Sequence, residues 1–294
     1  MTGRRELLVG ALASLAACAA RPRGAAIRQA VVSPAAPLPV APRETTAATL
    51  RAQRLAWAGV RLELDTASLW IDPLVNADVW GPALRDPVAL VRSDHGANYA
   101  VITHRHPDHF DPAAIRAALG DDGTLVCAPD NAALAAARGF KPRVGQLYEP
   151  ILLGDDFTAT AVPAVDGYGD PQVSWVVTGG GRRIIHCGDT LWHGAWWHIG
   201  RQYGPFDAAF LPINGARFAW RQPVSDVPAV LTPEQAVAAA VVLGARLLVP
   251  IHYGVVGAEG YAELPEVESL LATAAARRGI AIQVVRPGDW VRWR

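Results

Sequence analysis

The stretch Thr103-His104-Arg105-His106-Pro107-Asp108-His109-Phe110-Asp111 guides the interpretation of the whole chain. Its pattern is H-x-H-x-D-H, with three imidazoles and a carboxylate within six positions. Each of these groups needs a hydrogen-bond or charge partner when it is buried, so a purely structural loop gains little stability from having four of them close together. Imidazole nitrogen and carboxylate oxygen suit zinc, manganese and iron, and the pattern therefore predicts a metal site. The alternative is a histidine-rich surface loop.

We expect this stretch to be a loop at the end of a strand. Ala100-Val101-Ile102 before it is an apolar, strand-like run, and Pro107 would not be tolerated inside a helix. After it, Asp111 and Pro112 are typical of the N-cap and first residue of a helix that runs to Leu119. Asp111 has this structural explanation and is not predicted to be a metal ligand.

Length and composition limit the class of protein. The chain has 294 residues, of which 51% are hydrophobic, enough to bury the core of one large domain or two small ones. The formal net charge is +0, and no basic run is interleaved with aromatic residues. We therefore do not expect nucleic acid to be a partner. No feature of the sequence indicates an oligomeric state.

Residues 1–18 have the features of an export signal. Arg4-Arg5 precedes an apolar run from Leu7 to Ala17, which is too short to span a bilayer stably. The segment from Leu15 to Cys18 resembles a bacterial lipoprotein cleavage box, so that Cys18 would become the lipid-modified first residue. The alternative is a secretory signal cut near Ala19. The arginine pair also resembles a weak twin-arginine signal.

The rest of the chain is predicted to be a tether and one domain. Residues 19–48 are rich in Ala, Pro and Arg and are expected to form a flexible tether. Residues 49–294 would form the globular domain. Lipid on Cys18 would hold this domain near a membrane surface, which predicts a periplasmic or cell-envelope lipoprotein.

Two further cysteines, Cys127 and Cys187, each lie in an apolar, strand-like run. We expect both to be small buried hydrophobic residues. A disulfide between them is the alternative in an oxidising compartment.

Hydrophobic periodicity predicts a layered α/β domain. Strands are expected within 55–64, over 68–71, 100–102 and 124–127, as short strands after residue 138 up to about Ala164, and over 172–178, 182–185, 207–212, 247–251 and 281–285. Helices are expected over 111–119, 131–138, 192–203, 233–243 and 265–278. The first half is rich in strands and the second alternates strands with helices, which is typical of this class. Residues 74–98 are expected to be an irregular loop that could form one wall of a pocket.

Polar residues follow several other predicted strands. Asp189 stands in Gly-Asp-Thr, His252 in Ile-His-Tyr-Gly, and Asp166 in Val-Asp-Gly. Each alone is equally typical of a turn or a packed histidine, but together with the first stretch they place polar groups at the carboxyl ends of apolar strands. Ligands gather there in α/β sheets. Asp72, at another strand end, either starts a turn or points toward this edge.

These motifs together resemble the metallo-β-lactamase fold superfamily, from about Arg51 to the C-terminus. The histidine loop, Asp189 and His252 stand in the order of that family. The resemblance implies a four-layer αβ/βα sandwich and two divalent metal ions, zinc by first expectation, with manganese or iron as alternatives. A water between two such ions loses a proton near neutral pH and becomes the nucleophile. The implied ligands are His104 and His106 for one ion, Asp108, His109 and His252 for the other, and Asp189 between them.

Five later segments are similar to one branch of that superfamily. That branch includes the N-acyl-phosphatidylethanolamine-hydrolysing phospholipase D and the ascorbate-phosphate lactonases. The similar segments are residues 188–190, 199–200, 204–207, 211–213 and 231–236.

Two positions depart from the family pattern. Asp166 stands near the position of a usual histidine ligand. It would either bind the first metal, favouring a harder ion, or leave one site weak. Val230 or Leu231 stands where the branch often has a histidine, so a substrate contact made there in relatives would be absent.

His193 lies four residues after Asp189 and is predicted, with Asp108, to be a catalytic residue. It could protonate a leaving group, because the ordinary pKa of histidine lies near the operating pH. The alternative is a surface histidine at a helix start. Trp192, Trp196 and Trp197 are expected to pack in the core, with an apolar pocket as the alternative.

The predicted function is metal-dependent hydrolysis of a phosphodiester, ester or lactone bond in a small-molecule or lipid-like substrate of the envelope. Asp108 and the resemblance to this branch make a lactam hydrolase the less expected activity. The alternative is a non-catalytic envelope lipoprotein that keeps the fold for binding or assembly, for which Asp166 is the one supporting feature.

Overall fold

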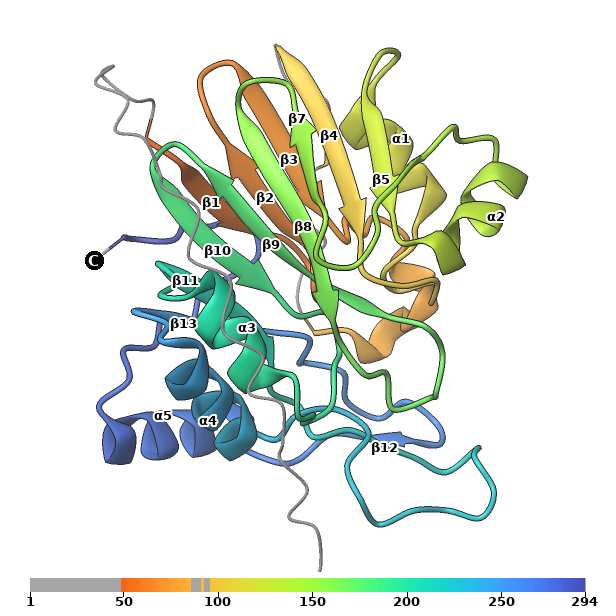
Figure 1. The fold of residues 1–294 in the computed structure, drawn as a ribbon. Helices are drawn as coiled ribbons and strands as arrows, with labels where there is room; N and C mark the ends of the chain where they lie inside the picture. Colours follow the sequence, from red (N-terminus) through yellow and green to blue (C-terminus); the bar gives the residue numbers. More distant parts are fainter. Residues whose placement is uncertain (1–48, 86–90, 93–95, 294) are drawn as a thin grey trace, which may run out of the picture. The chain divides into compact units, whose positions relative to one another are not determined.

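Two six-stranded sheets form the centre of the fold in the computed structural model, which describes residues 49–85, 91–92 and 96–293 (Figure 1). The predicted export signal, the tether and Cys18 lie outside the described residues. No helix among the residues described is long and apolar enough to cross a membrane.

The first sheet has the strand order β1-β2-β3-β4-β5-β6. Its first three strands pair antiparallel and the later ones pair parallel. The strands are β1 (Arg51–Arg54), β2 (Val60–Glu63), β3 (Ala67–Ile71), β4 (Ala97–Ile102), β5 (Thr124–Cys127) and β6 (Arg143–Val144). The connection from β3 to β4 contains two short 3-10 helices, η1 (Ala77–Val79) and η2 (Gly81–Ala83).

The second sheet has the order β13-β11-β10-β9-β8-β7. Strands β7 to β10 pair antiparallel, whereas β10, β11 and β13 pair parallel. The strands are β7 (Pro150–Leu153), β8 (Phe157–Pro163), β9 (Val173–Gly179), β10 (Arg182–His186), β11 (Ala208–Pro212) and β13 (Leu248–Ile251). A separate two-stranded sheet pairs β12 (Arg217–Phe218) with β14 (Tyr261–Ala262).

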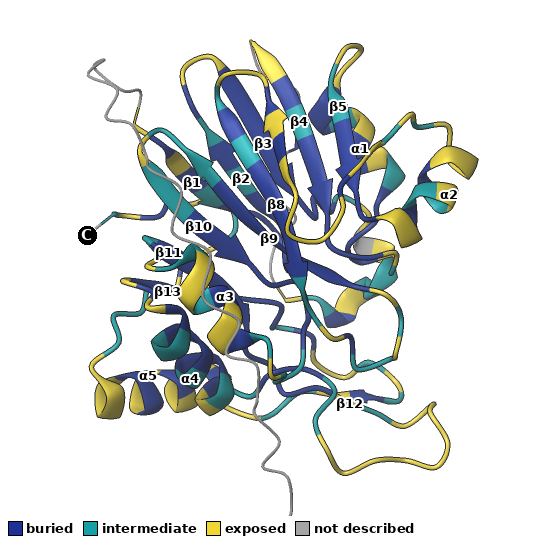
Figure 2. Ribbon diagram, viewed as in Figure 1, coloured by how far each residue is buried: buried dark blue, intermediate teal, exposed yellow. Residues whose placement is uncertain are grey.

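Three hydrophobic clusters divide the molecule into four layers. One cluster lies between the sheets and draws side chains from both, for example Leu69 and Trp175. A second packs β10, β11 and β13 against the helices α3 (Trp196–Tyr203), α4 (Pro233–Leu243) and α5 (Val267–Arg278). A third packs β4 and β5 against α1 (Pro112–Leu119) and α2 (Pro129–Ala137). The helices expose their outer sides while the strands are mostly buried (Figure 2). The predicted α/β fold is thereby confirmed.

Helix starts follow the sequence signals. The side chain of Asp111 accepts hydrogen bonds from the backbone N–H groups of Ala113 and Ala114, with Pro112 at the first helical position. This confirms the predicted N-cap of α1. Thr232 and Gln235 form a reciprocal capping box at the start of α4.

The strand expected within residues 55–64 is β2, and residues 55–59 before it form a turn in which Leu55 N–H donates to the Gly59 oxygen. Two predicted boundaries were wrong. The expected helix from Trp192 begins only at Trp196, and before it Leu191 N–H donates to the Val165 oxygen. The last expected strand is reduced to one bridge, between Ile282 and Leu248.

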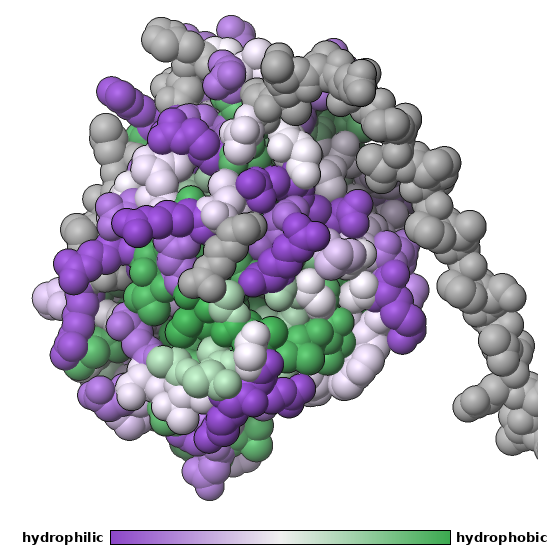
Figure 3. Space-filling model, turned by 90° about the vertical axis from the view of Figure 1, so that its left-hand side faces the viewer, coloured by the Kyte–Doolittle hydropathy of each residue, from purple (hydrophilic) through white to green (hydrophobic). Residues whose placement is uncertain are grey.

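The segment after α5 covers the outer edges of both sheets. It forms a bridge with β13 through Leu248, and near its end Val291 N–H donates to Ala52 in β1. This segment therefore removes two strand edges that could otherwise pair with another chain. The side of the molecule on which it lies has apolar side chains surrounded by polar ones (Figure 3), and Val284 is 41% exposed.

Cys127 and Cys187 are both buried free thiols in two different hydrophobic clusters. Burial raises the pKa of Cys127 to about 11 and that of Cys187 to about 12, so both stay protonated. The expectation of two small buried hydrophobic residues is confirmed.

Candidate metal centre

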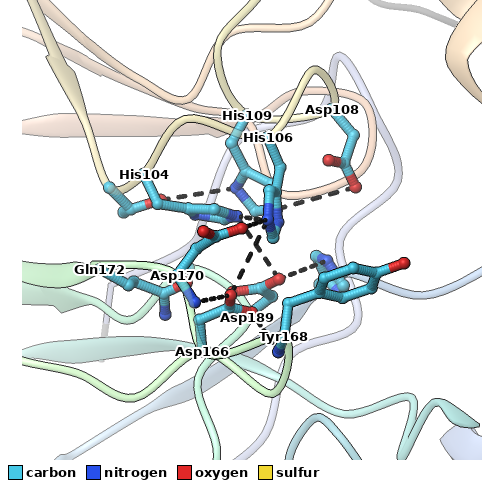
Figure 4. A network of polar contacts seen from close by, with 12 residues as sticks. His104, His106, Asp108, His109, Asp166, Tyr168, Asp170, Gln172 and Asp189 are labelled. Atoms are coloured by element: carbon cyan, nitrogen blue, oxygen red, sulfur yellow. Dashed lines mark hydrogen bonds and ion pairs between the residues drawn. The ribbon is translucent and has the colours of Figure 1, made fainter. Parts of the chain in front are cut away.

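The carboxyl ends of β3, β4, β8, β10 and β13 bring the predicted site residues together. The loop after β4 carries His104, His106, Asp108 and His109. Three further side chains come from the segments after β8, β10 and β13, namely Asp166, Asp189 and His252. Figure 4 shows the labelled members of this set pointing toward one another.

The donor atoms of these residues lie at spacings compatible with shared ions. His104 Nε2 lies 2.9 Å from His106 Nδ1 and 3.5 Å from Asp189 Oδ2. Asp189 Oδ2 is also 3.9 Å from His252 Nε2. Three groups each have their ligand atoms within 4.8 Å of one another: His104, His109 and Asp189; Asp108, His109 and His252, which share His109 with the first group; and a separate group of His106, Asp166 and Asp170.

Three buried polar atoms in this cluster have no hydrogen-bond partner among the described residues: His109 Nε2, His252 Nε2 and Asp189 Oδ1. Leaving such atoms unpaired in the interior costs about 1–3 kcal/mol each. Each is a ligand atom that zinc or a similar ion accepts. The residues present therefore fit a bound metal, which would satisfy all three.

The electrostatics of the cluster also fit a cation. Burial raises the pKa of Asp189 to about 7, although the nearby His109 lowers it. Burial lowers the pKa of His104 and of His252 far below the ordinary value, with neighbouring histidines adding to the effect. Both rings are therefore neutral near pH 7, the form that binds a metal. The raised pKa of Asp189 means that its surroundings stabilise its charged form poorly, and a bound divalent ion would supply the positive charge that stabilises it.

Asp72 orients the His109 ring through a contact with its Nδ1 atom. This fully buried carboxylate accepts hydrogen bonds from Thr103 N at 2.8 Å and Thr103 Oγ1 at 2.5 Å, and lies 2.8 Å from His109 Nδ1. Burial lowers the pKa of His109, but the charge of Asp108 and the hydrogen bond to Asp72 raise it to about 9. A carboxylate on Nδ1 fixes the ring so that Nε2 faces the metal position.

Trp57 links two predicted ligands. Its indole Nε1 donates to Asp108 Oδ2 at 3.0 Å, and its ring centroid lies 4.1 Å from that of His252. Trp57, Asp72 and His252 all have positive φ, of 58°, 44° and 57°. Non-glycine residues in this conformation carry about 1–3 kcal/mol of strain each and persist where surrounding structure imposes it, often at functional sites.

Asp166 and Asp170 lie at the mouth of the cluster. Asp170 Oδ2 is 2.9 Å from His106 Nε2 and its Oδ1 is paired with Arg105, whereas Asp166 Oδ2 is 3.8 Å from His106 Nε2. The hydrogen bond to His106 lowers the pKa of Asp170, which therefore stays charged. Asp170 thus fixes the His106 ring so that the Nδ1 atom of His106 faces His104. Asp166 accepts the backbone N–H groups of Tyr168 and Asp170, which holds it beside the same ring.

His193 is placed apart from this network. Its ring stacks on Trp196 with centroids 4.3 Å apart, and neither ring nitrogen has a partner among the described residues. Burial lowers its pKa to about 4. No polar contact in the described part of the chain joins it to the histidine loop, and its catalytic role stays a prediction. Trp196 is a core residue, as expected, while Trp197 is 48% exposed.

Sequence reasoning missed Asp170 and Trp57 and left Asp72 open. The only local signals were a carboxylate before proline, in Asp72-Pro73 and Asp170-Pro171, and an isolated tryptophan in a turn. Neither signal distinguishes a turn from a residue that supports a metal ligand.

Comparison with known proteins agrees with this geometry. A family model described as the β-lactamase superfamily domain matches residues 67–253. An uncharacterized protein of Mycobacterium bovis is 29% identical over 286 residues, covering 90% of this chain and 75% of the relative. A UPF0173 metal-dependent hydrolase of Rubrobacter xylanophilus is 30% identical over 205 residues, covering 64% of this chain and 76% of the relative. Igni18, a metallo hydrolase of Ignicoccus hospitalis, is similar in structure with a TM-score of 0.60 at 19% identity, covering 82% of this chain and 97% of Igni18, which shows the fold alone.

Proposed function

Because the chain belongs to the β-lactamase superfamily, whose domain model matches residues 67–253, we propose that it is a metal-dependent hydrolase. The observation that carries this proposal is the convergence from three separate strand ends of His109 Nε2, His252 Nε2 and Asp189 Oδ1, buried ligand atoms without a hydrogen-bond partner among the described residues. Bound divalent ions would supply a water nucleophile near neutral pH and polarise the oxygen of the scissile bond.

The side chains divide into two sets around Asp189. His104 and His106, together with Asp166, would hold one ion, and Asp108, His109 and His252 the other. Asp72 and Asp170 each contact one nitrogen of the His109 and His106 rings, which directs the other nitrogen of each ring inward. Trp57 holds Asp108 through its indole N–H. The donor set, four imidazoles with carboxylates, supports zinc as the first candidate and manganese or iron as alternatives.

We further propose that the scissile bond is a phosphodiester or an ester or lactone. The support is the sequence similarity to the phospholipase D and lactonase branch and the name of the Rubrobacter relative, a metal-dependent hydrolase. A substrate from the cell envelope, lipid-like or small, fits the proposed location of the protein.

Metal analysis together with hydrolysis tests the proposed function. The purified protein is expected to contain two divalent ions per chain and to hydrolyse bis(4-nitrophenyl) phosphate or a 4-nitrophenyl ester. A chelator is expected to abolish the activity, and added zinc, manganese or iron(II) to restore it. A protein that binds no metal and hydrolyses neither compound would refute the proposal and favour the non-catalytic envelope protein.

We also propose that Cys18 carries a lipid that holds the chain on a membrane after export, because the segment from Leu15 to Cys18 resembles a lipoprotein cleavage box. Cys18→Ser is expected to move the protein from the membrane fraction to the soluble fraction of the envelope, since the acyl chains supply the membrane affinity. Immunoblots of fractionated cells measure this. Equal membrane association of both proteins would contradict the lipid anchor.

A further inference from the structure

The loop that follows β13 carries His252 in a strained backbone conformation. His252 is buried and has a φ of 57°, in a region that residues other than glycine rarely adopt. Such a conformation persists only where the surrounding structure holds the backbone in place. The orientation of this imidazole therefore depends on contacts that other segments of the chain make with the loop.

Glu263 supplies two of these contacts. Its Oε2 accepts a hydrogen bond from the Gly254 N–H at 2.9 Å, and its Oε1 accepts one from the Val255 N–H at 3.0 Å. These N–H groups belong to the second and third residues after His252, so one carboxylate fixes the backbone that follows the ligand. Further hydrogen bonds of this backbone, such as that from Arg85 N–H to the Gly254 oxygen at 3.0 Å, join main-chain atoms only. Glu263 is therefore a support that a substitution can remove.

Asn214 connects the same carboxylate to the ring of His252. It is fully buried, and its Nδ2 donates to the Tyr261 hydroxyl at 2.7 Å and to Glu263 Oε1 at 3.4 Å. The same Nδ2 atom lies 3.2 Å from His252 Nδ1. One nitrogen of the imidazole thus faces an amide that Glu263 and Tyr261 hold in place, and the other nitrogen, Nε2, is left for a metal ion.

On the basis of the proposed function, we propose that Glu263 is a positioning residue for the metal ion bound by His252. Contacts that orient a ligating histidine change metal affinity about 10- to 100-fold when they are removed. The hydrogen bonds that Glu263 makes with described residues go to the loop of His252 and to Asn214. None of them reaches another implied ligand, so the ion assigned to His104 and His106 should not depend on Glu263.

Zinc affinities of Glu263→Ala test this inference. In this variant the Gly254 and Val255 N–H groups lose their acceptor, and the strained loop can relax so that the His252 ring leaves its position. The affinity for one zinc ion, measured by competition with a chromophoric chelator, is expected to fall about 10- to 100-fold, while the affinity for the other stays as in the wild type. The visible spectrum of the cobalt(II)-loaded protein should also change, because one ion loses an imidazole ligand.

Two further variants separate positioning from a loss of stability. Glu263→Gln keeps one oxygen, which can accept one of the two N–H groups, so its affinity should lie between those of Glu263→Ala and the wild type. Asp207→Ala is the matched control, because Asp207 is also a partly buried carboxylate that accepts a backbone N–H, that of Arg183 near the start of β10, whereas Asp189 follows the end of that strand. This control should bind both ions as the wild type does.

The outcomes for the inference and for the proposed function are distinct. Wild-type affinity for both ions in Glu263→Ala, an equal loss of both ions, or the same loss in Asp207→Ala would each overturn the inference. A wild-type protein that binds two ions but hydrolyses neither bis(4-nitrophenyl) phosphate nor a 4-nitrophenyl ester would reject only the proposed function, because the zinc affinities would still decide the role of Glu263. A wild-type protein that binds no ion would reject both.

Discussion

Replacement of Asp189 by Asn is expected to lower kcat/KM by at least about 100-fold, because even residues that only support a metal ligand cost 10- to 100-fold when changed. Asp189 lies within 4 Å of both His104 Nε2 and His252 Nε2, so it is the residue placed to contact both metal positions. The amide keeps the shape of the side chain but removes the negative charge. Metal content measured by mass spectrometry should fall in parallel with hydrolysis.

The same substitution should not destabilise the metal-free protein. Burial raises the pKa of Asp189, which means that the folded protein disfavours its charged form, and a neutral amide relieves this. The melting temperature without metal is therefore expected to be unchanged or higher, whereas added zinc should no longer raise it. Asp121→Asn, at an exposed carboxylate, is the control and should behave as the wild type. Full metal content in Asp189→Asn would show that Asp189 is not a ligand.

Replacement of Asp72 is expected to have the second largest effect. In Asp72→Ala, the Thr103 N–H and hydroxyl and His109 Nδ1 all lose their buried partner. Breaking a buried, charged network in this way typically costs about 3–5 kcal/mol, so the free energy of unfolding from urea titration should fall by that amount. Metal affinity should fall with it, because the carboxylate that orients the His109 ring is then missing.

Asp72→Asn separates these two effects. The amide can still accept from Thr103 N, but an NH₂ group placed opposite His109 would donate to Nδ1 and leave the proton on Nε2. We therefore expect a smaller loss of stability but a loss of metal affinity of about 10- to 100-fold, measured by competition with a chromophoric chelator. Asp111→Asn is the matched control, since Asp111 is also a buried carboxylate that accepts backbone N–H groups, without contact to a histidine. Wild-type metal affinity in Asp72→Asn would disprove the orienting role.

The layered fold was predictable because its signals are local. Three of these signals can each be recognised from a few adjacent residues: the apolar run of β4, the N-cap at Asp111 and the capping residues of α4. The late start of α3 has no local signal: before it, Leu191 N–H donates to the Val165 oxygen, a contact between segments far apart in sequence.

The centre of the site was predictable for a related reason. His104, His106, Asp108 and His109 are adjacent in sequence, and Asp189 and His252 each end a strand recognisable from its apolar run. Their supporting residues were not predictable in this way. Asp170 acts on His106 across 64 residues and Trp57 on Asp108 across 51, and neither has a pattern that marks it as anything but a turn or core residue. Such pairs become visible only when the chain is folded.

The segment that follows α5 has a consequence for the order of folding. The first strand of the domain, Arg51–Arg54, depends on residues far along the chain: Arg54 donates to the Val285 carbonyl at 2.9 Å, and Trp293 donates to that of Leu50 at 2.6 Å. During synthesis this strand therefore waits for partners that are made more than 200 residues later, after both sheets have been translated. A chain truncated before Val285 would leave the first strand without these contacts.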